Sequence, residues 1–333
     1  MEIALLLQSN SNECKFWRRH GELYDKDHNQ AVTMSAILKQ SGYYTTIWLS
    51  LKDFIKAKYA QGKKDIIVFP MIENCFERNR SCIVPSALEL CGFSYVGSDA
   101  YAQMITADKK LFKVICETIG LVCPRGIEIT HQMTQPHVMS ALDNSGLLFP
   151  VVLKYRYGTM SFGVCKVNDY ATLFSTSKML LEQEPDSSLI CEEYIDGEEA
   201  TVPIIGTGDQ ARALALVQYT DNNGCPLELY DLSWKRDRDE DVEMYTYPSG
   251  VKWVEDIKRK CLYLHNYLGL RDMSRIDLRI TKDHRAYFLE ANCLPNLCIN
   301  SAFDPKSYDC GQQFSDILLE IIASAKARVQ RGG

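Results

Sequence analysis

The strongest constraint on this chain is a pair of strand-like runs near its C-terminal end. Residues 276–280 alternate apolar and charged side chains, residues 286–289 are apolar, and the polar residues 282–285 lie between them. Two strand-like runs that flank a short polar segment predict a β-hairpin. The fold must therefore include an antiparallel pair of strands, and residues at the open end of this hairpin must meet.

Four polar side chains stand at that open end. Glu290 and Asn292 are two residues apart, so on a strand they point to one face, and the hairpin brings Asp277 toward them. Their carboxylate and amide oxygens are the ligands that Mg²⁺ prefers. Arg275 beside them can stabilise negative charge that develops in a reaction. Alone, these residues also fit an exposed hairpin with solvated carboxylates; the motifs upstream favour a magnesium site.

The composition excludes several classes of function. The chain has 333 residues, is 46% hydrophobic and 24% charged, and carries a net charge of −6. It therefore has the material for two or three globular domains but lacks the basic balance of a nucleic-acid binder. No apolar run approaches the ~20 residues of a membrane span, and residues 1–7 lack the basic flank of a signal peptide. The 13 cysteines have no C-x-x-C pair, which disfavours a zinc or disulfide framework and fits a cytoplasmic protein.

The order of the predicted elements indicates an α/β fold with α+β parts. The first third alternates strand-like and helix-like segments, which is typical of a parallel sheet. Later segments read as helices 108–119, 254–268 and 311–329 and as strands 149–154, 163–167, 189–195, 201–205 and 213–217. We therefore predict a parallel α/β unit at the start of the chain and a small antiparallel unit inserted between larger ones.

Two further segments indicate a nucleotide. Lys154 ends an apolar run, and a lysine in that position either extends to solvent or pairs with an anion. The glycines and hydroxyls of residues 157–163 form a turn whose backbone N–H groups can lie over phosphates. The edge of the run 189–195 can contact a purine, and Glu199 can accept hydrogen bonds from ribose hydroxyls. Taken separately, each segment also fits an ordinary surface hairpin, and residues 235–241 also fit a solvated loop.

In this order, the motifs resemble those of ATP-grasp ligases and are most similar to the D-alanine–D-alanine ligase branch. The resemblance runs from about residue 65 to the C-terminal helix and rests on the motifs at 95–99, 107–109, 149–154, 193–198, 275–278 and 288–295. It implies an ATP-grasp fold with an N-terminal parallel α/β domain and two α+β domains that hold ATP between them, with bounds 1–105, 106–200 and 201–333. It also implies two Mg²⁺ ions, with Mn²⁺ as a substitute, and a homodimer.

The resemblance also implies roles for individual residues. The metal ligands would be Asp277, Glu290 and Asn292. ATP would be bound by Lys109, Lys154, Ser161, Glu192, Glu193, Tyr194, Ile195, Glu199 and Lys235. Of these, Glu192 through Ile195 would form the adenine hinge, Glu199 would hold the ribose, and Lys235 would reach the γ-phosphate. Catalysis would involve Arg275, Lys235 and Ser161, and the substrates would be bound by Glu13, Arg275, Asn296 and Ser301.

The substrate positions depart from those of D-alanine ligases. No His-Gly pair follows the strand 66–69, and the residues around Glu13 differ from the family pattern. Asn296 replaces a glycine whose backbone N–H lines the oxyanion site, although asparagine tolerates the positive φ of such a turn. Tyr155, not proline, follows Lys154. These departures predict a specificity other than two D-alanines.

We therefore predict an ATP-dependent carboxylate–amine ligase. It would join an amino acid to another amino acid or a small carboxylic acid through an acyl phosphate. Three alternatives stay open: a true D-alanine–D-alanine ligase of peptidoglycan synthesis, a catalytically silent ATP-binding relative, and a phosphotransferase that stops at a phosphorylated product. The complete set of charged residues argues against the silent relative.

Overall fold

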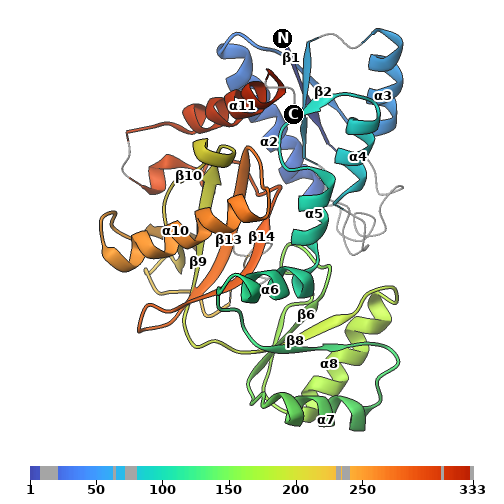
Figure 1. Ribbon diagram of the computed structural model, residues 1–333, viewed down its shortest axis with the longest axis vertical. Helices are drawn as coiled ribbons and strands as arrows, with labels where there is room; N and C mark the ends of the chain where they lie inside the picture. Colours follow the sequence, from blue (N-terminus) through green and yellow to red (C-terminus); the bar gives the residue numbers. More distant parts are fainter. Residues whose placement is uncertain are drawn as a thin grey trace.

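The structure, a computed structural model, describes residues 1–7, 22–62, 65–71, 81–229, 234, 241–308 and 311–330. Three β-sheets follow one another along the molecule, with helices packed around them (Figure 1). Within these residues, no helix is both long and apolar enough to cross a membrane.

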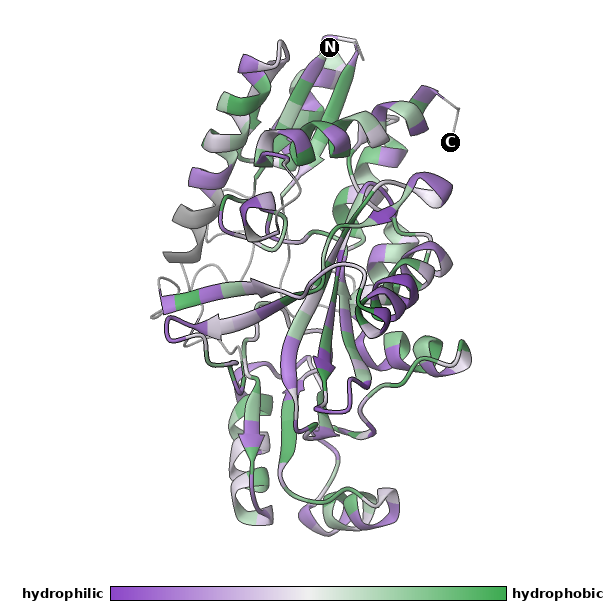
Figure 2. Cartoon of the chain, turned by 90° about the vertical axis from the view of Figure 1, so that its left-hand side faces the viewer, coloured by the Kyte–Doolittle hydropathy of each residue, from purple (hydrophilic) through white to green (hydrophobic). Residues whose placement is uncertain are grey.

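The first sheet is parallel, as the sequence predicts. Its strand order is β2–β1–β3–β4, and each neighbouring pair is parallel. The two central strands, β1 and β3, are nearly continuous apolar runs, which is typical of a parallel sheet covered on both faces (Figure 2). Its elements are β1 (Glu2–Leu6), α2 (Glu22–Gln40), β2 (Tyr44–Trp48), α3 (Leu51–Ala60), β3 (Ile66–Pro70), α4 (Ile83–Leu90), β4 (Ser94–Tyr95) and α5 (Ala100–Ala107).

The second sheet is a small antiparallel unit with the order β5–β8–β6–β7. Three of its four strands were predicted; β5 was missed because it has only four residues and begins with a glycine. Leu153, Tyr155 and Leu189 are buried in its apolar core. Its elements are β5 (Gly126–Ile129), α7 (Gln135–Ser145), β6 (Val151–Tyr155), β7 (Cys165–Val167), α8 (Tyr170–Gln183) and β8 (Leu189–Glu193).

The third sheet carries the predicted hairpin. Its order is β12–β11–β9–β13–β14, and β10 pairs with the far end of β9. The single strand predicted at 213–217 is wrong, because residues 214–216 separate two strands. The elements are β9 (Glu198–Ile205), η1 (Gly208–Gln210), β10 (Arg212–Ala213), β11 (Val217–Asp221), β12 (Val242–Thr246), α10 (Lys252–Tyr267), β13 (Met273–Ile280), β14 (Ala286–Asn292) and η3 (Pro305–Ser307).

Two helices pack against sheets that lie far from them in the sequence. Phe112 of α6 (Lys109–Thr118) shares a core with Val202, Phe288 and other residues of the third sheet. Ile317 of α11 (Phe314–Gln330) shares a core with Ile3 of the first sheet. Figure 1 shows α11 beside the first sheet, close to both chain termini. The domain bounds 1–105, 106–200 and 201–333 stay a prediction.

Candidate active site

The hairpin gathers its four polar side chains in pairs. β13 and β14 are antiparallel, with Arg275 opposite Asn292 and Asp277 opposite Glu290. The register shifts after Asp277, which marks a β-bulge at this point. All four residues line one large cavity, so the predicted hairpin and the predicted meeting of these side chains are confirmed.

Asp277 is the centre of this group. It accepts hydrogen bonds from Thr201 Oγ1 at 2.7 Å, from Arg275 Nε and Nη2 at 2.8 Å each, and from Asn292 Nδ2 at 2.8 Å. Its side chain is 20% exposed, so solvent and ligands reach it from the cavity. Burial alone would lower the pKa of Arg275, but the Asp277 carboxylate outweighs burial and holds this pKa above its ordinary value.

The donor set fits a hard divalent cation. Asp277, Glu290 and Asn292 offer oxygens from two facing strands, and these are the ligands that Mg²⁺ or Mn²⁺ takes. Both carboxylates are ion-paired with cations of the protein, Asp277 with Arg275 and Glu290 with Lys109. In the described part of the chain, no group of three His, Cys, Asp or Glu side chains could hold a metal ion, and at the hairpin an amide oxygen completes the two carboxylates. The hairpin is therefore the candidate metal centre.

Lys109 connects the hairpin to the loop of the second sheet. Its ammonium lies 2.9 Å from Glu290 Oε2 and donates to the carbonyl of Gly158 at 2.5 Å. Lys109 opens α6, and Asp108 caps this helix by accepting from the N–H groups of Lys110 and Leu111. A helix start therefore fixes the cation between two parts of the cavity wall.

A buried ion triad lies beside Lys109. Glu192 is 2% exposed, and its two oxygens lie 2.7 Å from the ammonium groups of Lys154 and Lys113. Burial alone would raise the pKa of Glu192, but the two cations outweigh burial and keep the carboxyl ionised. Lys154 has thus found an anion, one of the two outcomes expected from the sequence. Lys113 was missed; its position four residues after Lys109, on the same helix face, was the only signal.

The segment after Glu192 turns two side chains toward the cavity. Glu193 and Ile195 line it, while Glu193 also binds Arg125 at 2.8 Å. The ring of Tyr194 lies between Lys166 and Arg279, with each cation within 5.0 Å of its centroid. Glu199 lines the cavity, and one of its oxygens lies 3.5 Å from Arg279.

The cavity has a volume of about 1070 Å³ and is lined from all three sheets. Ser161 lines it in the left-handed conformation, with φ 58°. Ser301 is buried, and its hydroxyl accepts from the N–H groups of Cys298 and Phe303. Asn296 lines the cavity without a positive φ, whereas Asn300 adopts one, with φ 65°.

The remaining sequence predictions cannot be placed. Glu13 and Lys235 lie outside the described residues, as do the departures from the family pattern at 8–15 and 72–80. The other predicted site residues, apart from Tyr194, all line the single cavity described above.

Known proteins resemble this chain in sequence and in fold. Residues 116–323 match the model of the family described as D-ala D-ala ligase C-terminus. A D-alanine–D-alanine ligase from Methylibium petroleiphilum is 32% identical over 246 residues, covering 73% of this chain and 74% of that protein. The D-alanine–D-alanine ligase from Bacillus anthracis complexed with ATP has a TM-score of 0.77 at 23% identity and covers 100% of both chains. VanG D-Ala:D-Ser ligase from Enterococcus faecalis has a TM-score of 0.72 at 17% identity, covering 97% of this chain and 99% of its own.

The three sheets and the likeness to solved D-alanine–D-alanine ligases show the ATP-grasp fold, so the predicted fold is confirmed. The family match covers well over half of the chain, and the Methylibium protein passes 30% identity. The protein therefore belongs to the D-alanine–D-alanine ligase family.

Proposed function

We propose that the protein is an ATP-dependent carboxylate–amine ligase that forms a peptide-type bond. One observation carries this proposal: a single cavity brings Lys109, Lys154 and Arg275 together with Asp277 and Glu290. Cations beside hard oxygen ligands are the groups that phosphoryl transfer needs. The family to which the chain belongs supports the same conclusion.

Asp277, Glu290 and Asn292 would hold the divalent metal. The metal, when bound, neutralises charge on the phosphates. These three residues are now bonded to Arg275, Lys109 and one another, so metal binding would exchange contacts that are already polar and exposed to the cavity. The site needs no new buried charge to accept the ion.

The nucleotide would lie along the second sheet. Glu192 through Ile195 would face the adenine, Glu199 would accept from the ribose, and Lys109 and Lys154 would contact phosphates. The Glu192 triad supports this role for Lys154, because it holds the ammonium at a fixed place in the cavity wall. Ser161 and Lys235 would act from the loops that close over the phosphates.

The chemistry follows from this arrangement. A carboxylate oxygen of the first substrate attacks the γ-phosphorus, and the bond to ADP breaks. The amine of the second substrate then attacks the carbonyl carbon of the acyl phosphate, inorganic phosphate leaves, and the nitrogen loses a proton. Arg275 would stabilise the oxyanion of the tetrahedral state. Exclusion of water from the closed cavity would protect the acyl phosphate from hydrolysis.

We further propose substrates other than two D-alanines. The substrate side of the cavity is lined by amide side chains, among them Asn29, Gln30, Asn296 and Asn300. A fold of this kind does not fix the second substrate, since VanG is named a D-Ala:D-Ser ligase. A true D-alanine–D-alanine ligase remains the second candidate, which the match to the Methylibium protein favours. Glu13 and Ser301 would contact the substrates in either case. We also propose a cytoplasmic homodimer, to be tested by sedimentation.

The test is a screen of all pairs of D- and L-amino acids, with ATP and Mg²⁺. We expect phosphate release that depends on the amino acids, together with a product whose mass equals the two substrates minus water. Asp277→Asn serves as the control and should lower both signals about 10²–10³-fold. Phosphate release without a C–N product, with a hydroxamate trapped by hydroxylamine, would instead establish a phosphotransferase. No phosphate release with any pair would establish the silent relative.

A further inference from the structure

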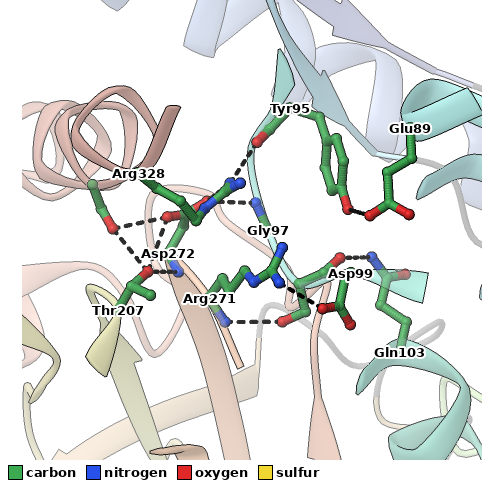
Figure 3. Close-up of polar contacts among 11 residues, drawn as sticks. Glu89, Tyr95, Gly97, Asp99, Gln103, Thr207, Arg271, Asp272 and Arg328 are labelled. Carbon is green, nitrogen blue, oxygen red and sulfur yellow. Dashed lines mark hydrogen bonds and ion pairs between the residues drawn. The ribbon is translucent and has the colours of Figure 1, made fainter. Parts of the chain in front are cut away.

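Asp272 is a buried carboxylate that the reaction does not use. It is 0% exposed and lies directly before β13, with φ 62° in the left-handed region. Few residues other than glycine adopt this conformation, although aspartate is one of those that do. Figure 3 shows its side chain at the meeting point of the first sheet, the third sheet and α11.

Both oxygens of Asp272 are fully bonded. Oδ1 accepts from Thr207 Oγ1 at 3.1 Å and from Ser324 Oγ at 2.8 Å. Oδ2 accepts from the N–H of Gly97 at 2.8 Å and from Arg328 Nη2 at 2.7 Å. We call these five residues the Asp272 network. A buried carboxylate with four partners is costly to disturb, because each partner loses a hydrogen bond to an anion.

The network ties β4 to β13 across the molecule. Arg328 also donates to the carbonyl of Tyr95 at 2.7 Å, at the end of β4. A second ion pair runs alongside, from Arg271 Nη2 to Asp99 Oδ2 at 2.6 Å (Figure 3). Two neighbouring residues before β13 therefore both hold the segment that follows β4.

The two segments that the network joins, after β4 and before β13, each lead to a wall of the cavity. Within the described residues, no member of the network lines the cavity, so none touches a substrate there. Arg275, however, stands only three residues along β13 from Asp272. On the other side, β4 pairs with β3, whose last residues Phe69 and Pro70 line the cavity. The network is therefore three residues along the chain from Arg275. On the other side, only the pairing of β4 with β3 separates it from the wall formed by β3.

Apolar packing alone would not fix these two walls. Ile205 and Met273 of the third sheet share a core with Phe69 of the first sheet and Ile317 of α11. Hydrophobic contact is non-directional, so it holds the sheets together without setting their angle. Directed bonds to a buried carboxylate supply that constraint.

We propose that Asp272 and Arg328 are positioning residues that set the distance between Arg275 and the wall formed by β3, and thereby align the amino-acid substrates. This inference rests on the proposed ligase function. Because misplacement by about 1 Å can cost 10²-fold in rate, a small rotation between the walls should be visible in kinetics. The nucleotide contacts on the second sheet should be unaffected.

The test compares the variants Asp272→Asn, Ser324→Ala, Arg328→Gln and Arg328→Lys with the wild type. We expect Asp272→Asn to raise KM for the amino acids about tenfold or more, with KM for ATP changed less than twofold. Ser324→Ala removes only one hydrogen bond of the network and should raise KM for the amino acids by a smaller factor. It takes the place of Asp272→Asn in the test if that variant does not fold. Arg328→Lys keeps the charge and should restore part of the loss seen in Arg328→Gln. The matched control is Arg212→Gln, which breaks the exposed Arg212–Glu320 pair between β10 and α11 and should change neither KM.

Amide exchange supplies a readout that needs no activity. The Gly97 N–H donates to Asp272, so residues 94–99 should exchange faster in Ser324→Ala and Asp272→Asn than in Arg212→Gln. Equal increases in both KM values, or unchanged KM values in a folded variant with faster exchange, would overturn the positioning role. A wild-type protein inactive with every amino acid would instead overturn the ligase function, and the exchange measurement would still decide whether the network holds the two sheets.

Discussion

Two aspartates, Asp272 directly before β13 and Asp277 within it, differ in access more than in chemistry. Asp277 and Asp272 each bind a threonine hydroxyl and an arginine at 3.1 Å or less. Asp277 lines the cavity and is 20% exposed, whereas Asp272 is fully buried. A carboxylate that is open to the cavity can exchange its hydrogen bonds for a ligand. A buried carboxylate keeps its hydrogen bonds and holds two parts of the chain together.

One strand therefore carries exchangeable bonds at the cavity and has permanent bonds at its buried start. Bonds at the cavity can be exchanged for a metal or a phosphate, because solvent and ligands reach them. Bonds at the buried end have no competitor, so they persist and set geometry. Substitutions of residues exposed to the cavity should therefore change activity more than stability. Substitutions of buried residues should change stability or the alignment of the substrates.

Glu192 combines the two situations, since it lines the cavity but is almost fully buried. Glu192→Gln leaves Lys113 and Lys154 as unpaired buried cations, which typically costs about 3–5 kcal/mol. We expect urea unfolding to show a loss of that size. Glu193→Gln, which breaks the exposed pair with Arg125, is the control and should unfold almost as the wild type does. Similar stabilities for the two variants would contradict the triad.

Asp277→Asn tests the exchangeable end of β13. Asparagine can still accept from Thr201, so we expect the melting temperature to stay close to that of the wild type. Amino-acid-dependent phosphate release should fall about 10²–10³-fold, since the site loses an anionic ligand and the partner of Arg275. A variant that melts much earlier but keeps its activity would reverse the assignment of this residue.

Arg275→Lys keeps the charge but removes the two parallel bonds to Asp277. Lysine cannot reproduce this planar geometry, so we expect kcat to fall about 10²-fold or somewhat less. Arg285→Lys, in the exposed turn of the same hairpin, is the matched control and should keep full activity. Steady-state kinetics of the two variants measured in parallel decide the point.

The smallest effect is expected from His265, a fully buried residue of α10 that contacts Ser274 of β13. Its Nδ1 lies 2.7 Å from the hydroxyl of Ser274, and burial lowers the pKa of His265 to about 4. Between pH 6.5 and 4 the unfolded chain binds a proton that the folded chain does not, so stability falls as the pH falls. At pH 5.5 this amounts to about 1 kcal/mol relative to pH 7.5. Urea unfolding at both pH values should show the loss in the wild type and in His137→Gln but not in His265→Gln.

Much of the cavity could be predicted from sequence because its signals are local. The hairpin with Asp277, Glu290 and Asn292 follows from alternation and a short turn, and these residues lie within 16 positions of one another. Lys113 could not be recognised, because a lysine on an amphipathic helix is normally solvated. Its burial depends on Glu192, which comes from another element.

The Asp272 network was invisible for a related reason. Its partners come from positions 97, 207, 324 and 328, and no period or spacing connects them. The family resemblance likewise supplied the ATP-grasp fold but predicted nothing about this contact. The positive φ that asparagine tolerates occurs at Asn300 and not at Asn296, and local propensity alone does not distinguish the two positions.

The most direct test of the central claim follows an oxygen atom. The amino acid that supplies the carboxyl group is labelled there with ¹⁸O and is incubated with the enzyme, ATP, Mg²⁺ and the second substrate. If the carboxylate is activated as an acyl phosphate at Arg275 and Asp277, one ¹⁸O atom must appear in each inorganic phosphate released with product. Phosphate that carries no label, formed while the peptide-type product accumulates, would contradict the account.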